Sequence, residues 1–284
     1  MFNNCENLID VIIPSGITGI RKNAFSNTSI SSITIPTNVT ELDEVFTNCN
    51  SLTEVFFSGN RTDALSLFKT FYGCTSISSF TATGFSYSGN VLNVLNDTFG
   101  GCTNLKSVEL AARRIGKRVF QGCTSLTSIT LTLTPASIDD DFINGCTNLT
   151  ATTLPNPEQG YSICCLNGSS LQRVQFGTEV KSRSGVYDDL NFKNDIIGEG
   201  RYFGVGCTEL SRIDILVGGN FTYKGSQTIP DNFFSTDLPA NGVVYYYHKS
   251  LQEPEITSYT AASKFVEKLG NGWTLVDGGV YDTE

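Results

Sequence analysis

The sequence predicts a solenoid of the α/β class that is rich in β-strand, and three observations carry this prediction. One pattern of aromatic, cysteine and aliphatic residues recurs along most of the chain. The aliphatic part of the pattern alternates with polar residues, which is the period of a β-strand with one buried face. Successive copies follow one another at a similar interval, which is typical of stacked coils.

The repeat reads Phe-x-x-Cys-x-x-Leu-x-x-Val-x-Ile-Pro, with exchanges among the aliphatic residues. The seventh and ninth copies carry one extra residue before the cysteine, and the eighth has Cys165 in place of Phe and Gly168 in place of Cys. We therefore expect about nine coils. Their first positions are Phe2, Phe25, Phe46, Phe71, Phe99, Phe120, Phe142, Cys165 and Phe203.

The Val-x-Ile segment of each copy is expected to form one short strand. A single strand cannot bury its aliphatic face, so neighbouring coils should pair in parallel about 4.8 Å apart. A second short strand at Ile17–Ile20 and a helical turn at Ala24-Phe25 would complete a coil. We predict one parallel sheet from the strands centred on Val11, Ile33, Val55, Phe80, Val108, Ile129, Thr152, Val174 and Ile213.

With Val-Thr-x-Ile and Ala-Phe after it, this pattern resembles the BspA-like, Treponema-type leucine-rich repeats of bacterial surface proteins. The resemblance covers about residues 2–215. It implies a right-handed leucine-rich-repeat solenoid with its parallel sheet on the concave face and a C-terminal cap of one strand and one helix. We therefore divide one continuous domain into a solenoid, residues 1–215, and an irregular last coil with its cap, residues 216–284.

The C-terminal segment has the pattern expected of such a cap. Val243–Tyr247 is rich in residues that favour strands. A helix should follow, with Thr257 or Ser258 as its N-cap and Gly270 at its end. The residues expected on its buried face are Tyr259, Ala262, Phe265, Val266 and Leu269.

Charge and hydropathy exclude several classes of partner. The formal net charge is −9, and only 17% of residues are charged. Nucleic acid and anionic membranes both require clustered cations, so neither is expected to bind. No apolar run reaches the length of a membrane span. The repeat already begins at Phe2 without a signal peptide, so we expect the N-terminal cap to be missing.

Seven of the nine cysteines occupy one position of the repeat. Zinc sites need ligand pairs such as Cys-x-x-Cys, and the only close pair here is Cys164-Cys165. Disulfides between neighbouring coils are an alternative. We expect nine reduced thiols, with the repeat cysteines packed inside as small apolar side chains. On that view Cys123→Ser should be more harmful than Cys123→Ala, because it buries an unpaired hydroxyl.

Other residues that could carry chemistry have simpler structural interpretations. His248 is the only histidine, which excludes metal sites built on two histidines. Gly198-x-Gly200, with Gly204 and Gly206, follows no clear strand and so lacks the context of a dinucleotide loop. The acidic run 139–141 lacks the ligand spacing of a calcium loop. We assign no catalytic residue, no cofactor and no metal.

The outward side chains of the predicted strands form two lanes along the sheet. The first contains Asp10, Ser32, Glu54, Ser79, Ser107, Ser128, Ala151, Arg173 and Arg212, and the second contains Ile12, Thr34, Phe56, Thr81, Glu109, Thr130, Thr153, Gln175 and Asp214. The lanes could also be a soluble surface without a ligand. The candidate partner-binding residues are Ile12, Thr34, Glu54, Phe56, Glu109, Arg173, Gln175, Arg212 and Asp214.

The leading functional hypothesis is a non-catalytic recognition or adhesion module that binds a protein or glycan. The resemblance implies that it is displayed on a bacterial cell or secreted. One alternative is a structural spacer or scaffold within a larger protein. Another is a hydrolase with Asp188 or Asp189 and Glu199 as its carboxylates. We expect a monomer whose uncapped N-terminus offers a surface for end-to-end contacts.

Overall fold

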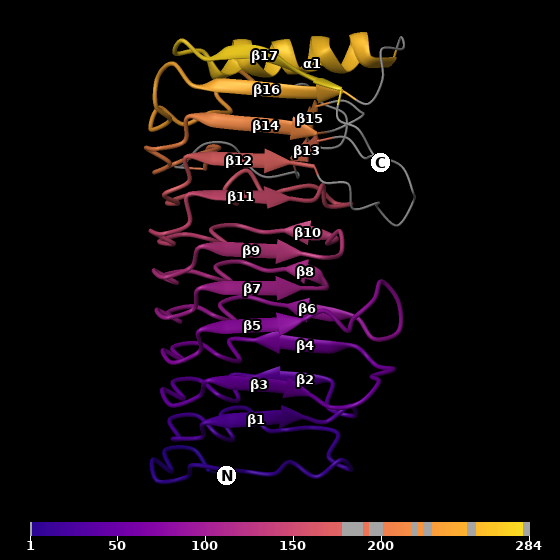
Figure 1. The fold of residues 1–284 in the computed structure, drawn as a ribbon, viewed down its shortest axis with the longest axis vertical. Coiled ribbons are helices and arrows are strands. Elements are labelled where there is room, and N and C mark those ends of the chain that lie inside the picture. The colour runs from indigo at the N-terminus through magenta and orange to yellow at the C-terminus, as the bar shows by residue number, and fades with distance from the viewer. Residues whose placement is uncertain are drawn as a thin grey trace. The chain divides into compact units, whose positions relative to one another are not determined.

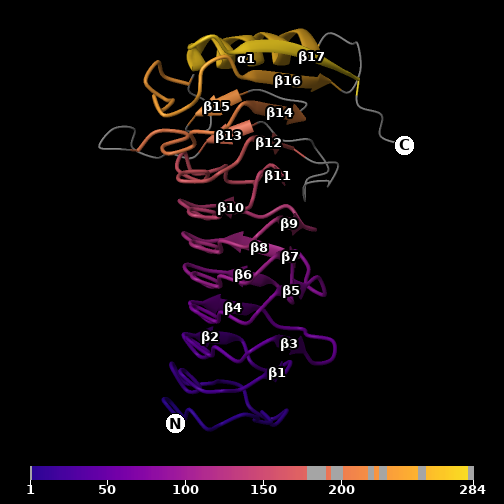
Figure 2. The ribbon, with the colours of Figure 1, turned by 60° about the vertical axis from the view of Figure 1, so that its left-hand side comes forward.

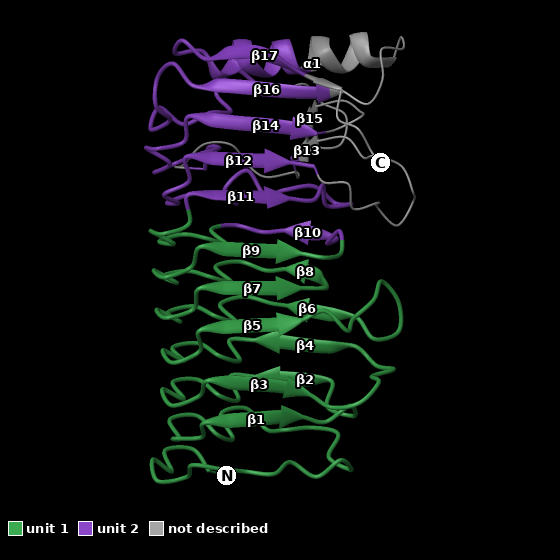
Figure 3. Ribbon diagram, in the orientation of Figure 1, with its two compact units in different colours: residues 1–133, 141–149 green, residues 134–140, 150–284 purple. Residues whose placement is uncertain are grey.

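The computed structural model describes residues 2–177, 190–192, 201–216, 221–223, 229–248 and 254–280. The chain divides into two compact units, coloured separately in Figure 3. Unit 1 comprises residues 1–133 and 141–149, and unit 2 comprises residues 134–140 and 150–284. Parallel strands dominate both, as expected of a β-rich leucine-rich-repeat solenoid. The predicted boundary at residue 215 stays a prediction.

Unit 1 contains two stacks of short strands, which Figures 1 and 2 show from two directions. The first stack carries the Val-x-Ile segments of the repeat, and the second follows them in each coil. The first stack consists of β1 (Ser32–Ile35), β3 (Glu54–Phe57), β5 (Ser79–Ala82), β7 (Ser107–Leu110) and β9 (Ser128–Leu131). The second consists of β2 (Glu41–Asp43), β4 (Leu65–Phe68), β6 (Leu92–Val94) and β8 (Ala112–Ile115), paired in that order.

The prediction of one continuous sheet is wrong. In unit 1, β1 pairs with β3, and β5, β7 and β9 form a separate sheet. The break falls where two neighbouring coils both place phenylalanine at inner positions. Phe57 and Phe80 lie 6.0 Å apart, and Phe80 also packs on Phe99 at 4.7 Å. The other strands of the first stack in unit 1 have aliphatic residues at these positions. The aromatic rings occupy more space than one strand spacing allows, so they hold β3 and β5 apart.

The first coil also departs from the prediction. Neither the segment around Val11 nor Ile17–Ile20 forms a strand. In this coil Ile9 and Ile12 are 67% and 85% exposed. Its strand segments therefore lack the burial that holds the later ones in place.

The turn that carries each Phe is the most regular part of unit 1. It is a hydrogen-bonded turn, not the predicted helical one. The N–H of Phe46 donates to Thr70 O at 3.0 Å, and that of Phe71 donates to Thr98 O at 2.9 Å. The rings stack in register, with centroids 5.7 Å apart for Phe25 and Phe46.

The residue before each cysteine adopts a left-handed backbone. It is asparagine in the early coils, as at Asn48 with φ 57°, and glycine in the later ones, as at Gly122 with φ 72°. These residue types tolerate positive φ at low cost. The positive φ also changes the alignment of the eighth copy. Gly168 has φ 64° and therefore occupies the position of the left-handed residue before the cysteine. Ser169, not Gly168, stands where the cysteine is expected.

The cysteine side chains link one coil to the next. Cys74 donates its thiol hydrogen to Phe46 O at 3.0 Å, and Cys123 donates to Phe99 O at 3.0 Å. Burial raises the pKa of Cys102 and Cys146 to about 12, so both stay protonated donors. Cys5 is exposed, which contradicts its predicted place inside the coil.

Unit 2 contains a five-stranded parallel sheet. Its strands are, in order, β11 (Ala151–Leu154), β12 (Arg173–Phe176), β14 (Arg212–Leu216), β16 (Val243–His248) and β17 (Thr274–Val280). The strand predicted at Val243–Tyr247 is β16, whereas β17 was not predicted. A second group contains β13 (Leu190–Phe192) paired with β15 (Phe221–Tyr223), and a bridge joins Ile138 of β10 (Ser137–Ile138) to Tyr161.

Helix α1 (Pro254–Leu269) begins before Thr257 and Ser258, so the predicted N-cap is wrong. Ala262, Phe265, Val266 and Leu269 are buried as predicted, and the side chain of Tyr259 lies outside the described residues. The helix ends at Gly270, which has φ 58°. No helix in the described part of the chain is long and apolar enough to cross a membrane.

The thiol hydrogen bonds change the expectation for Cys123. Because Phe99 O accepts from the thiol, a serine hydroxyl placed there would have a partner, and Thr28 and Ser169 already occupy this position in other coils. We predict that Cys123→Ser lowers the unfolding free energy by under about 1 kcal/mol and Cys123→Ala by about 1–2 kcal/mol, reversing the order predicted from sequence. Urea denaturation of both variants measures this. A serine variant less stable than the alanine variant would contradict it.

Candidate functional site

The strand register brings several candidate residues side by side. Thr34 lies opposite Phe56 in unit 1, and Arg173 lies opposite Arg212 in unit 2. Gln175 lies opposite Asp214. The two predicted lanes therefore exist within each sheet, although the break between β3 and β5 interrupts them.

The unit 1 candidates lie on the surface but form no polar cluster. Glu54, Thr34 and Glu109 are exposed, Phe56 is 51% exposed, and Ile12 lies before β1. Among the described residues of these strands, neighbouring outward positions are mainly serine and threonine. This face is mostly uncharged, and its two charged side chains, Glu54 and Glu109, are acidic.

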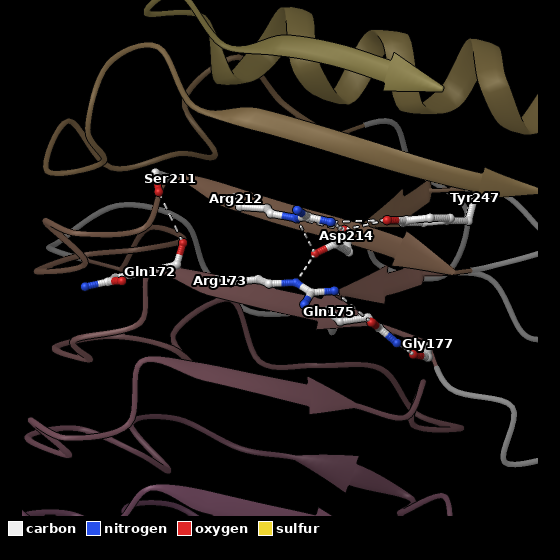
Figure 4. Close-up of polar contacts among 8 residues, drawn as sticks. All are labelled: Gln172, Arg173, Gln175, Gly177, Ser211, Arg212, Asp214 and Tyr247. Carbon is white, nitrogen blue, oxygen red and sulfur yellow. Dashed lines mark hydrogen bonds and ion pairs between the residues drawn. The ribbon is translucent and has the colours of Figure 1, made fainter. Parts of the chain in front are cut away.

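In unit 2 the candidates form a compact charged cluster, drawn in Figure 4. The Asp214 carboxylate accepts hydrogen bonds from Nε of Arg173 and from Nε and Nη2 of Arg212, the last at 2.8 Å. The Arg173 side chain is 45% exposed and that of Arg212 is 38% exposed, whereas Asp214 is fully buried. Two guanidinium groups around one carboxylate leave one net positive charge facing solvent.

Two tyrosines that sequence reasoning missed complete the cluster. The hydroxyl of Tyr247 donates to Asp214 at 3.1 Å and accepts from Nη2 of Arg212 at 3.2 Å. The Arg212 guanidinium lies 4.1 Å from the centre of the Tyr245 ring, a cation–π contact. Both tyrosines lie on β16, beside β14. The β-propensity of Val243–Tyr247 indicates a strand but does not say which strand lies beside it.

Asp214 differs from its predicted role. It was expected as an outward residue available to a partner, but the arginines and Tyr247 cover it. Burial by itself would raise the pKa of Asp214, yet the hydrogen bonds and charges of Arg212 and Arg173 outweigh burial and hold that pKa below its ordinary value. Asp214 therefore stays ionised and positions two arginines at the surface.

The remaining sequence candidates are not brought together. Asp140 is paired with Arg201 and also accepts a hydrogen bond from Ser162. Gly204 and Gly206 belong to the turn before Cys207. Asp188, Asp189, Glu199 and the side chain of His248 lie outside the described residues. No cluster of three or more potential metal ligands occurs in the described ranges.

We predict that Asp214→Asn lowers the unfolding free energy by roughly 1–3 kcal/mol at pH 7, because two adjacent cations lose their shared carboxylate. Since the folded-state pKa is depressed, this contribution is present above about pH 4 and is lost as pH falls through the folded-state value. The difference between the variant and the wild type should therefore shrink as pH falls below about 4 and through the depressed folded-state pKa. The matched control Glu109→Gln, at an exposed position of the same lane, should change stability by under about 0.5 kcal/mol. Denaturation at several pH values tests both.

Comparison with known proteins assigns the family. A family model described as BspA-type leucine-rich repeat region (6 copies) matches residues 1–84 and 68–187, which together span more than half of the chain. No curated protein matches.

Solved structures of bacterial leucine-rich proteins are also similar to this chain, at low identity. The pneumococcal vaccine antigen PcpA is 14% identical, over 94% of this chain and 72% of that chain, with a TM-score of 0.38. A leucine-rich cell surface protein from Faecalibacterium prausnitzii A2-165 is 14% identical over 77% and 72%, with a TM-score of 0.35. A leucine-rich repeat protein from Bacteroides ovatus is 16% identical over 97% and 74%, with a TM-score of 0.28. Because these scores are low, the assignment rests on the family model. The chain belongs to the BspA-type leucine-rich repeat family.

Proposed function

We propose that this chain is a non-catalytic recognition module that binds a protein or glycan partner at the bacterial cell surface. The observation that carries the proposal is the cluster of Arg173, Arg212, Asp214, Tyr245 and Tyr247 on the unit 2 sheet. Arginine and tyrosine are the residues most enriched where interfaces gain their affinity.

The cluster is suited to recognition because its donors are held in place before a partner arrives. Asp214 fixes both guanidinium groups, and Tyr245 supports one of them from the side. Side chains that are already ordered lose less entropy on binding. Outward N–H groups of both arginines remain at the surface, because the side chains are 45% and 38% exposed.

Surface display is supported by relatives. The Faecalibacterium prausnitzii structure is described as a cell surface protein, and PcpA is described as a vaccine antigen. We extend surface display to this chain as part of the proposal. The structural-spacer alternative is favoured by a different observation, the small and mostly uncharged side chains along the unit 1 lanes.

Binding of the purified full chain to a panel of extracellular matrix proteins and mucin-type glycans separates these two functions. We expect saturable binding to at least one panel member, and Arg173→Gln should weaken it about tenfold, equivalent to about 1.4 kcal/mol. Arg212 remains in that variant to neutralise Asp214. Arg114→Gln is the matched control, because Arg114 is exposed on β8, away from the first strand stack.

The two variants also define the results that oppose the proposal. If Arg173→Gln leaves the binding affinity unchanged, the arginine cluster is not part of the recognition surface. No saturable binding to any panel member would favour the spacer.

A further inference from the structure

The break between β3 and β5 opens a groove in unit 1 that is separate from the arginine cluster. Its volume is about 470 Å³, within the range of small-ligand sites. The residues along it come from β3, from β5 and from the segments that follow each strand. Figure 1 shows these two strands as neighbours in the first stack.

The walls of the groove are backbone groups without a ladder partner. Ser58 N donates to Ile35 O, on the far side of β3, and Ala111 N donates to Ala82 O, on the far side of β5. In a strand, successive residues direct their N–H and C=O groups to opposite edges. Within the described residues 2–133, no backbone hydrogen bond joins β3 to β5. The groups that face the groove therefore belong to Val55, Phe57, Ser79 and Thr81.

The floor is apolar and the rim carries an aromatic ring. Val55 and Phe57 are half-buried, whereas their register partners Ile33 and Ile35 are 2% and 0% exposed. Phe56 stands at the rim with 51% of its surface exposed. An apolar floor with a few fixed polar groups is the usual composition of a small-ligand site.

The width of the groove limits what can enter. An inserted peptide strand would need β3 and β5 about 9.6 Å apart, twice the pairing distance. The same two coils remain hydrogen-bonded through their turns, with Asn48 N donating to Tyr72 O at 2.8 Å. They are also joined where β4 pairs with β6. These bonds keep the coils one spacing apart on two sides, so an additional strand does not fit.

A hydroxyl group fits where a strand does not. It donates one hydrogen and accepts another, so it can bridge an N–H on one wall to a C=O on the other, as a water molecule would. The ligand must therefore carry several hydroxyls on a compact frame with an apolar face for Phe56 and the floor.

We propose that this groove binds a neutral saccharide. Its hydroxyls bridge the unpaired backbone of β3 and β5, and the C–H face of one ring packs on Phe56. The exposed carboxylate of Glu54 at the rim accepts a hydroxyl hydrogen and repels acidic sugars. Arg61 also lines the groove, but it is 8% exposed and its two terminal nitrogens donate to the carbonyls of Pro36 and Val39, so little of its guanidinium group is left to contact a ligand.

Calorimetric titration of the full chain with neutral di- to tetrasaccharides of hexoses and N-acetylhexosamines tests the proposal. We expect saturable binding with a dissociation constant of roughly 0.1–1 mM, typical of a small and open site. Phe56→Ala should weaken it at least tenfold. Tyr72→Ala is the matched control, because Tyr72 is a 42% exposed aromatic residue on the turn and should leave binding unchanged.

Amide hydrogen exchange gives a second readout at the groove itself. The amides of Val55, Phe57, Ser79 and Thr81 should exchange faster than ladder amides such as that of Val108, and a saturating sugar should slow them. The double variant Phe57→Ile with Phe80→Val should close the break and abolish binding while keeping Phe56.

Three results would overturn the proposal: no neutral saccharide binding at millimolar concentration, binding unchanged by Phe56→Ala, or protection of these amides by peptides but not by sugars. None of them bears on the arginine cluster, which lies in unit 2 and is tested with its own variants.

Discussion

The stacking of coils depends on the turn that leads to each cysteine. The N–H of the phenylalanine in this turn donates to the following coil. The carbonyl of the same phenylalanine accepts two hydrogen bonds, one from the N–H of the cysteine in its own coil and one from the cysteine thiol of the following coil. Phe99 O, for example, accepts from Cys102 N and from the thiol of Cys123. A left-handed asparagine or glycine makes the turn tight enough for this geometry. Each coil is thereby tied to both neighbours through buried bonds that a strand ladder need not supply.

Because the turns carry the stack, the strand ladder can vary. Between the third and fourth coils the turns stay bonded, with Phe46 N to Thr70 O at 3.0 Å, while β3 and β5 separate around Phe57 and Phe80. The separation gives unit 1 a groove with unpaired backbone. Unit 2 uses its sheet face differently, because Asp214 gathers two arginines and a tyrosine into one charged surface. Both features alter the strand face without disturbing the turns.

Features that follow from the periodicity within one repeat could be predicted from the sequence. Features that depend on packing between different coils could not. The spacing of Phe, Cys and aliphatic residues was enough to predict parallel strands and the lanes that pair Arg173 with Arg212. The sheet break follows from the combined size of two rings in different coils, which no single repeat reveals. Asp214 is polar and outward by period, and its burial comes from longer side chains on neighbouring strands. The thiol bond to a carbonyl likewise cannot be read from composition, and it is the reason that we now expect the opposite stability order for the two Cys123 variants.

Residue-resolved hydrogen exchange under native conditions tests most directly whether the turns carry the stack. The account predicts that the turn amides of Phe46, Phe71 and Phe99 are among the slowest in unit 1 and exchange only through global unfolding. The amides of Ser79 and Thr81, at the opened strand edge, should exchange through local fluctuations many times faster. Turn amides that exchange as fast as those at the strand edge would contradict the account.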